Sequence, residues 1–232
     1  HSALSTDTQG SRSTAIGYQA LTTQNFSSAT DSQNTAVGYN CGANLTTGIR
    51  NTLVGHLCGE NLTDSDFNVA IGHGALDADT KGNRSVAIGY NALSSQNFTT
   101  STDSLNVAVG FGSQIGTTTG TQNTSVGTNS LNATSMTGTG NSVYGLESGN
   151  SITSGAYNTF IGRYTADSLT TGAYNSHLGN DTDVSANNVQ FGVAIGHGAV
   201  DKGTNTGMVA PTSGVYQGNN SSSWSTTSDK RI

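Results

Sequence analysis

The sequence predicts an all-β fold, a parallel β-solenoid (β-roll) of about eleven coils of about 17 residues each. The segment Asn34–Tyr39 returns along the chain with small changes, for example at Asn51–His56 and Asn106–Phe111. Successive repeat glycines lie 17 residues apart, except for two intervals of 21 and one of 18. No apolar helical spacing accompanies them, and a period of this length is typical of stacked coils. The repeat glycines are Gly17, Gly38, Gly55, Gly72, Gly89, Gly110, Gly127, Gly145, Gly162, Gly179 and Gly196.

Columns of equivalent residues predict a strand just before each repeat glycine. The residue immediately before the glycine is large and apolar, and the residue three before it is Thr, Val or Ser, as in Val37 and Thr35. Side chains alternate along a strand, so these two columns share one face. The opposite face carries Ala or a similar residue, and the residue three after the glycine is again small, as in Ala20 and Cys41.

Stacking follows from how little each coil can bury. One large apolar residue and a few small ones per coil cannot close a core alone, so the coils must stack in register about 4.8 Å apart. We expect a ladder of amides at the corner where each strand begins, because Asn stands four residues before most glycines, as in Asn51, Asn123, Asn158 and Asn175. Eleven coils make a rod of roughly 50 Å.

The composition excludes several other classes. Of 232 residues, 31 are glycine and 9% are charged, against about 25% charged in an average domain. A single proline and the lack of a G-X-Y period exclude collagen, and a net charge of −6 offers no basic face for nucleic acid. No apolar run approaches the ~20 residues of a membrane span, so we expect no membrane insertion. His1 opens the chain without an initiator Met or a signal peptide, so we expect a piece of a longer chain.

The narrow interior also predicts a partner. Much of the Ile/Val and small-residue surface needs cover from another chain, and the smooth Ala/Gly face permits close approach. We expect the chain to bind itself, as a homotrimer around a threefold axis.

The Asn-Thr/Ser-x-Ala-Val/Ile-Gly unit resembles the head repeats of YadA-like trimeric adhesins over about residues 11–200. The resemblance implies a left-handed parallel β-roll in a threefold assembly. This chain departs from the family in having a longer unit.

The C-terminal residues resemble a second family, the phage tailspikes and tail fibres that carry an intramolecular chaperone domain of the endosialidase type. That domain opens on S-D-x-R-x-K, and Ser228, Asp229 and Arg231 match it. The resemblance implies self-cleavage before Ser228, as the nucleophile, in a longer precursor. It also implies a repeat domain over 1–200, an irregular or β tail over 201–232, and a virion fibre ahead of a bacterial trimeric autotransporter adhesin.

The two 21-residue intervals predict longer loops. Gln24–Ser32 and Gln96–Ser104 are near copies 72 residues apart, the length of four coils, and insertions in solenoids tend to lie on one binding face. Phe26 and Phe98 either contact a sugar or receptor or, as we favour, fold back over the neighbouring coil. The candidate binding-loop residues are Asn25, Phe26, Asp31, Asn97, Phe98 and Asp103.

The residues just after the first six glycines form an aromatic ladder if the coils stack. The ladder serves either as a packing column at a trimer interface, which we favour, or as a stacking surface for carbohydrate. Two histidines without a carboxylate column do not predict a metal site, and we expect no cofactor. The ladder is Tyr18, Tyr39, His56, His73, Tyr90 and Phe111.

Cys41 and Cys58 share one small slot in adjacent coils. They lie within reach of a disulfide, but we favour reduced thiols that act as small buried residues. Aspartate pairs such as Asp64/Asp66, Asp77/Asp79 and Asp181/Asp183 hint at Ca²⁺, although none lies in a calcium-binding motif, so turn capping is favoured.

Function is predicted as structural and adhesive. The only glutamates are Glu60 and Glu147 and no aspartate pair recurs outside turns, so we expect no enzyme acting on an external substrate. The main hypothesis is a trimeric rod at a virion or cell surface, displaying loops for a host glycan or receptor. The rivals are a passive spacer in a longer fibre and, less favoured, an ice-binding solenoid.

Overall fold

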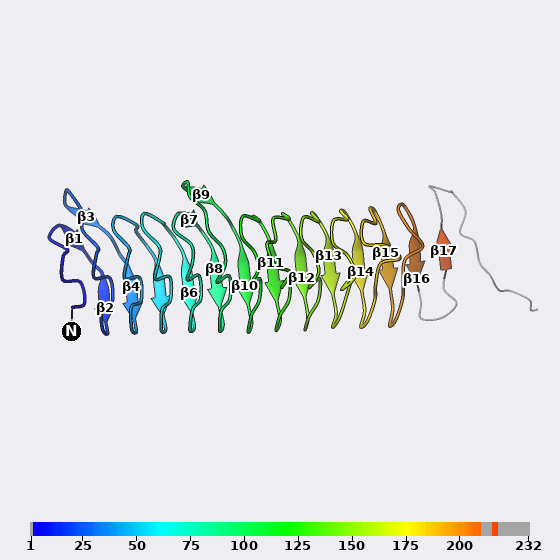
Figure 1. Cartoon of the computed structure of the whole chain (residues 1–232), viewed down its shortest axis with the longest axis horizontal. Helices are drawn as coiled ribbons and strands as arrows, with labels where there is room; N and C mark the ends of the chain where they lie inside the picture. Colours follow the sequence, from blue (N-terminus) through cyan, green and yellow to red (C-terminus); the bar gives the residue numbers. More distant parts are fainter. Residues whose placement is uncertain (1, 210–214, 218–232) are drawn as a thin grey trace, which may run out of the picture.

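The computed structural model describes residues 2–209 and 215–217, and over these residues the chain is all-β without a helix (Figure 1). One short strand per coil stacks into a 13-stranded sheet, in which all neighbours are parallel except the last pair. The sheet strands are β2 (Thr14–Ile16), β4 (Thr35–Val37), β5 (Thr52–Val54), β6 (Val69–Ile71), β8 (Val86–Ile88), β10 (Val107–Val109), β11 (Thr124–Val126), β12 (Ser142–Tyr144), β13 (Thr159–Ile161), β14 (Ser176–Leu178), β15 (Val193–Ile195), β16 (Gly207–Val209) and β17 (Val215–Gln217).

Two short pairs of strands lie outside this sheet, in the 21-residue coils. The strand β1 (Gly10–Ser11) pairs with β3 (Thr30–Asp31), and β7 (Gly82–Asn83) pairs with β9 (Thr102–Asp103). Figure 1 shows these pairs on the side of the rod away from the glycine-containing turns.

The strand register is the one that the repeat predicts. Thr35 pairs with Thr52 and Val37 with Val54, so equivalent residues stand directly above one another. The strands run across the long axis of the rod (Figure 1). The predicted parallel solenoid is therefore confirmed, with the twelfth strand β16 continuing the sheet past residue 200, where we expected the repeat domain to end.

Each chain closes its own core, so the prediction that it cannot do so is wrong. The middle residue of each strand points inward and is buried, as Leu53 and Phe160 are, whereas the Ile/Val column points outward and stays partly exposed. Leucines after the repeat glycine supply the missing volume, as Leu76, Leu93 and Leu131 do with no exposed surface. The sequence pattern distinguished the two faces of the strand, but the expectation that the small-residue face also needs cover from another chain is wrong, because that face is buried within the chain.

Large and small residues alternate between facing core positions. Leu76 lies four residues after its glycine, and the strand residue of the next coil is Ala87. At the two coils whose strand residue is Leu53 or Phe160 the partner position is glycine: a Cβ on Gly42 would lie 2.8 Å from Leu53 Cδ1, and one on Gly149 would lie 3.3 Å from Phe160 Cδ2. Because interiors are close-packed, this exchange keeps the core volume of a coil nearly constant.

The repeat glycines are required by a close backbone approach. Gly38 has φ +141, and a Cβ there would lie 1.7 Å from the carbonyl oxygen of Gly55 in the next coil. No other residue fits, since both the left-handed backbone and the contact with backbone atoms exclude a side chain.

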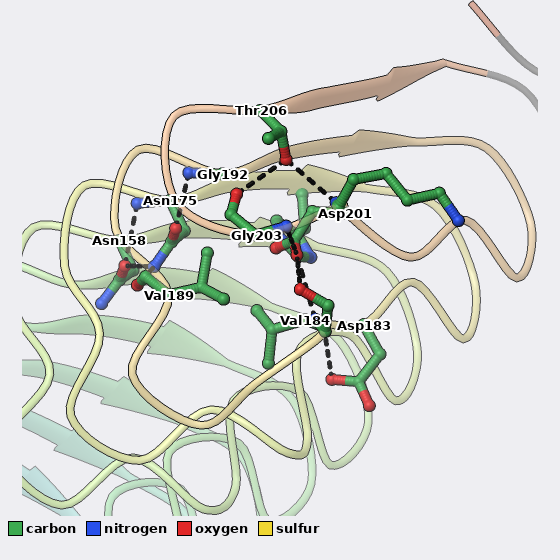
Figure 2. Close-up of polar contacts among 12 residues, drawn as sticks. Asn158, Asn175, Asp183, Val184, Val189, Gly192, Asp201, Gly203 and Thr206 are labelled. Atoms are coloured by element: carbon green, nitrogen blue, oxygen red, sulfur yellow. Dashed lines mark hydrogen bonds and ion pairs between the residues drawn. The ribbon is translucent and has the colours of Figure 1, made fainter. Parts of the chain in front are cut away.

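The predicted asparagine ladder is present in the buried corner. The Asn34 Oδ1 atom accepts hydrogen bonds from the backbone N–H and the Nδ2 of Asn51, at 2.8 and 3.2 Å, and Asn51 Nδ2 also donates to Ser65 O at 2.8 Å. Similar bonds join Asn158 to Asn175 and Asn175 to Gly192 (Figure 2). Each rung satisfies buried backbone groups that would otherwise lack a partner.

Candidate functional site on the outer face of the sheet

One surface of the rod, which we call the outer face, collects the exposed apolar side chains. It consists of the residues five, three and one before each repeat glycine and the residue one after it, all of which point away from the core. Among the described residues, every large hydrophobic side chain that is exposed lies on the outer face except Val200. Examples are Ile16, Tyr39 and Phe191, and Ile16 is 59% exposed.

The six predicted ladder residues form a continuous stack along one edge of the outer face, which we call the exit margin. Neighbouring ring centroids from Tyr18 to Phe111 are 4.8–5.1 Å apart and nearly parallel. Each inner ring therefore has both faces against other rings and presents only its edge. Sugar stacking needs a free ring face, so this geometry favours packing by the ladder over carbohydrate stacking.

His56 and His73 stack on one another at 4.8 Å within this ladder. Two stacked imidazoles cannot both bind one ion at the ~2.1 Å that zinc requires, because a shared ion needs nitrogens about 4 Å apart or closer. Within residues 2–209 and 215–217 no group of three or more His, Cys, Asp or Glu side chains is placed to hold a metal ion.

The opposite edge of the outer face, the entry margin, holds the residues five before each glycine, and the sequence analysis missed it. Tyr157, Tyr174 and Phe191 stack there at 5.3 and 5.0 Å. Farther toward the N-terminus, Arg50 and Arg84 lie on either side of the Phe67 ring, 5.3 and 5.7 Å from its centroid. Side chains alternate along a strand, so the residue just before each ladder asparagine should point outward. Applying this rule to the sequence would have revealed the column.

The loop aromatics are buried rather than offered to a ligand. Phe26 and Phe98 are each 7% exposed, so each ring folds against the coil, which is the alternative that we favoured. The exposed residues of the loops are small and polar, and Asn25 and Asn97 accept hydrogen bonds from Thr8 and Thr80. Asp31 and Asp103 pair with Arg12 and Arg84.

A carboxylate anchors each loop, and that of the second loop, Asp79, is buried. Asp79 accepts hydrogen bonds from Gln96 Nε2 at 2.6 Å and from the backbone N–H of both Gly82 and Phe98 at 3.1 Å. Burial raises the pKa of Asp79, although the hydrogen bonds act in the opposite direction. Asp7 repeats the arrangement in the first copy, bonded to Gln24 and Gly10. The duplication thus extends to the internal supports of the loops.

The remaining predicted sites are structural. Cys41 and Cys58 are free and buried, and their shared hydrogen bond together with burial raises the pKa of the Cys58 thiol. Asp183 accepts a hydrogen bond from the adjacent backbone N–H of Val184 at 2.8 Å, as a turn-capping residue would, whereas Asp66 accepts one from Ile49 of the preceding coil at 2.8 Å and so joins two coils. Ser228 lies outside the described residues, and cleavage there stays a prediction.

A buried ionisable pair near the C-terminal end was not predicted. His177 Nε2 lies 3.5 Å from Asp201 Oδ2, with both side chains fully buried, and Figure 2 shows Asp201 beside Gly203 and Thr206. Burial raises the pKa of Asp201, but hydrogen bonds from His177 and Ser185 outweigh it and hold that pKa below its ordinary value. Since solvent does not reach it, the pair serves to tie the last coils together.

The described residues include no helix with the length and apolarity needed to cross a membrane. Comparisons with protein families, with curated proteins and with solved structures found no match to this chain. The likeness to adhesin head repeats and to tail fibres rests on the sequence motifs alone.

Proposed function

We propose that this chain is a segment of a homotrimeric fibre at a virion or cell surface, in which three solenoids pack their outer faces around a common axis. The observation that carries the proposal is the gathering of exposed large apolar side chains on one face of a rod whose core is already closed. The number three and the left-handed winding come from the resemblance to adhesin head repeats.

The size of the outer face supports a permanent contact. Twelve strands spaced about 4.8 Å apart make a face roughly 55 Å long, and four columns make it roughly 20 Å wide. That is on the order of 1,000 Å², more than monomers usually expose as one apolar patch and comparable to one side of a stable interface.

The duplicated loops support a display role. They leave the rod away from the glycine-containing turns (Figure 1), and hydrogen bonds to Asp7 and Asp79 fix both of them. Their exposed Asn, Ser, Thr and Asp side chains supply the hydrogen-bonding groups that a host glycan or receptor would contact. We assign the chain no catalytic activity of its own.

Light scattering on the purified chain tests the assembly. We expect three times the mass of one chain, and a monomer when Ile161→Asp places a charge on the outer face. Val200→Asp is the matched control, because Val200 is exposed but lies off the outer face; this variant should stay trimeric. A monomeric wild type contradicts the proposal.

Binding to glycan arrays and host cells tests the display role against the passive spacer. Deleting residues 27–30 and 99–102 should leave the trimer intact and weaken surface binding at least tenfold. Unchanged binding, or no binding by the intact trimer, would make the segment a spacer.

A further inference from the structure

At four levels the two margins of the outer face carry an arginine on one side and an aromatic ring on the other. A level is one coil, with its entry-margin residue five before the glycine and its exit-margin residue one after it. In the N-terminal coils arginines are found on the entry margin, which also holds Phe67, and rings continue along the exit margin, as at Arg12/Tyr18 and Arg84/Tyr90. In the C-terminal coils the assignment reverses, and Tyr157 is on the entry margin with Arg163 on the exit margin.

Both margins are selective in what they carry. Each of the four arginines in the described part of the chain lies on one of the margins, and neither margin carries an Asp or Glu at any level. No level has two arginines, and the level of Leu105 and Phe111 pairs two apolar side chains. A guanidinium stacks favourably on an aromatic ring, whereas a carboxylate is repelled by the ring face.

The members of a level cannot meet within one chain. They are six residues apart, with a three-residue strand between them, and both side chains point away from the core. Within the described residues the cation–ring contacts join Arg50 and Arg84 to Phe67 and Arg163 to Tyr164, and none joins the two members of a level.

A cyclic assembly brings the two margins together. In a closed ring the contact is head to tail, so the exit margin of one chain faces the entry margin of the next. Rotation about the axis moves no residue along it, and therefore residues of the same level face each other.

We propose that the two margins form the seam between neighbouring chains, with the exit-margin residue of each level packed against the entry-margin residue of the same level in the next copy. Tyr18 and Tyr157, each of which has a ring of its own chain on one face only, then stack on the partner's guanidinium at their level, whereas Tyr90 presents its ring edge there. Arg12 and Arg84 are already held by Asp31 and Asp103 through the edge of the guanidinium, and Arg84 has Phe67 of its own chain on one side, which leaves its other face to stack. The inference rests on the proposed trimer and specifies how its chains are aligned.

Pairs of engineered cysteines test the alignment in the full chain. Gln122 and Thr128 are the exposed members of one level, too far apart to bond within a chain. The variant Gln122→Cys/Thr128→Cys should give a covalent trimer on non-reducing electrophoresis after mild oxidation. A second same-level variant, Tyr174→Cys/Asn180→Cys, should do the same.

The matched control is Gln33→Cys/Thr128→Cys, whose positions lie five levels apart, about 24 Å along the rod. It should remain monomeric on the same gel, as should the wild type with its buried Cys41 and Cys58. If light scattering shows trimers but neither same-level variant cross-links, or if the control cross-links equally well, the seam is overturned and the trimer stands. A monomeric wild type would overturn both.

Discussion

The N-terminal and C-terminal coils share one backbone register but fill their cores differently. In the N-terminal core cluster the strand residue is usually alanine, as in Ala70 and Ala87, and leucines outside the strand supply the bulk. In the C-terminal cluster two strand residues, Val143 and Phe160, add to the bulk that residues outside the strands supply. The register is set by backbone pairing, so the core can be redistributed within a coil as long as its volume is kept.

A polar band separates the two clusters. Ser113 hydrogen-bonds to Ser125 and to Ser130, the latter at 3.2 Å, and Gln114 Nε2 donates to the carbonyl of Val107 at 2.8 Å. All four side chains are buried. The solenoid therefore changes from one core arrangement to the other across coils that hold together by hydrogen bonds.

The largest expected loss of stability comes from replacing the repeat glycines, which the N-terminal and C-terminal coils both require. Gly38→Ala and Gly162→Ala should each destabilise the fold by about 4 kcal/mol, because each new Cβ would lie within 2.0 Å of a carbonyl oxygen in the next coil. Urea unfolding followed by circular dichroism measures the loss. Gly198→Ala, with φ +65 and no atom within 4 Å of the new Cβ, should cost only about 1 kcal/mol. Unequal losses at Gly38 and Gly162 would show that the two regions do not share the same requirement.

The next two substitutions convert the C-terminal core arrangement, with a large strand residue, into the N-terminal one, with a strand alanine. Phe160→Ala should cost about 4 kcal/mol through the cavity it leaves. Adding Gly149→Leu recreates the Leu76/Ala87 arrangement of the N-terminal coils and should recover about half of that loss. Gly149→Leu alone should cost about 2 kcal/mol by overpacking. The urea midpoints of the variants measure these changes in stability. A double variant less stable than Phe160→Ala would contradict the idea that the two core positions can exchange bulk.

The two buried aspartates predict opposite responses to acid. Asp79 has a raised pKa in the fold, so it binds protons more readily folded than unfolded, and its share of stability increases as pH falls through its folded pKa. Asp201 has a lowered pKa, so its share is present above the unfolded value of about 4 and is lost as pH falls through the folded pKa.

Urea midpoints of the wild type, Asp79→Asn and Asp201→Asn between pH 7 and pH 3 test this difference. The stability of Asp79→Asn should decrease relative to that of the wild type as the solution is acidified from pH 7. The stability of Asp201→Asn should decrease less than that of the wild type below about pH 4. Parallel curves for the three proteins would contradict the assignment.

The smallest expected effect concerns the two thiols of the N-terminal core. Cys58→Ala should change the free energy of unfolding by about 1 kcal/mol or less, since Ala75 and Ala92 fill the same slot in later coils. In the wild type, burial should keep both thiols from reacting with a disulfide reagent until urea unfolds the chain. Rapid reaction in the native protein would contradict that picture.

Much of the fold and part of the candidate site could be predicted from the sequence. The coil period, the strand positions, the Asn34–Asn51 type of ladder and the stack from Tyr18 to Phe111 all follow from residues that recur at equal spacing. Burial of Phe26 and Phe98 was favoured on residue type alone. The entry margin was missed because its residues vary widely, and the His177/Asp201 pair because it occurs once.

What the sequence determined by itself is the register, because the repeat glycines and asparagines act on the backbone of the adjacent coil. Only the tertiary structure decided which strand face became the core. Alternation distinguishes two faces without saying which one the chain will cover. The left-handed backbone at residues such as Leu21, Leu76 and Leu93 turns each coil over its alanine side. That turn brings residues of successive coils together inside one chain and leaves the Ile/Val face outside.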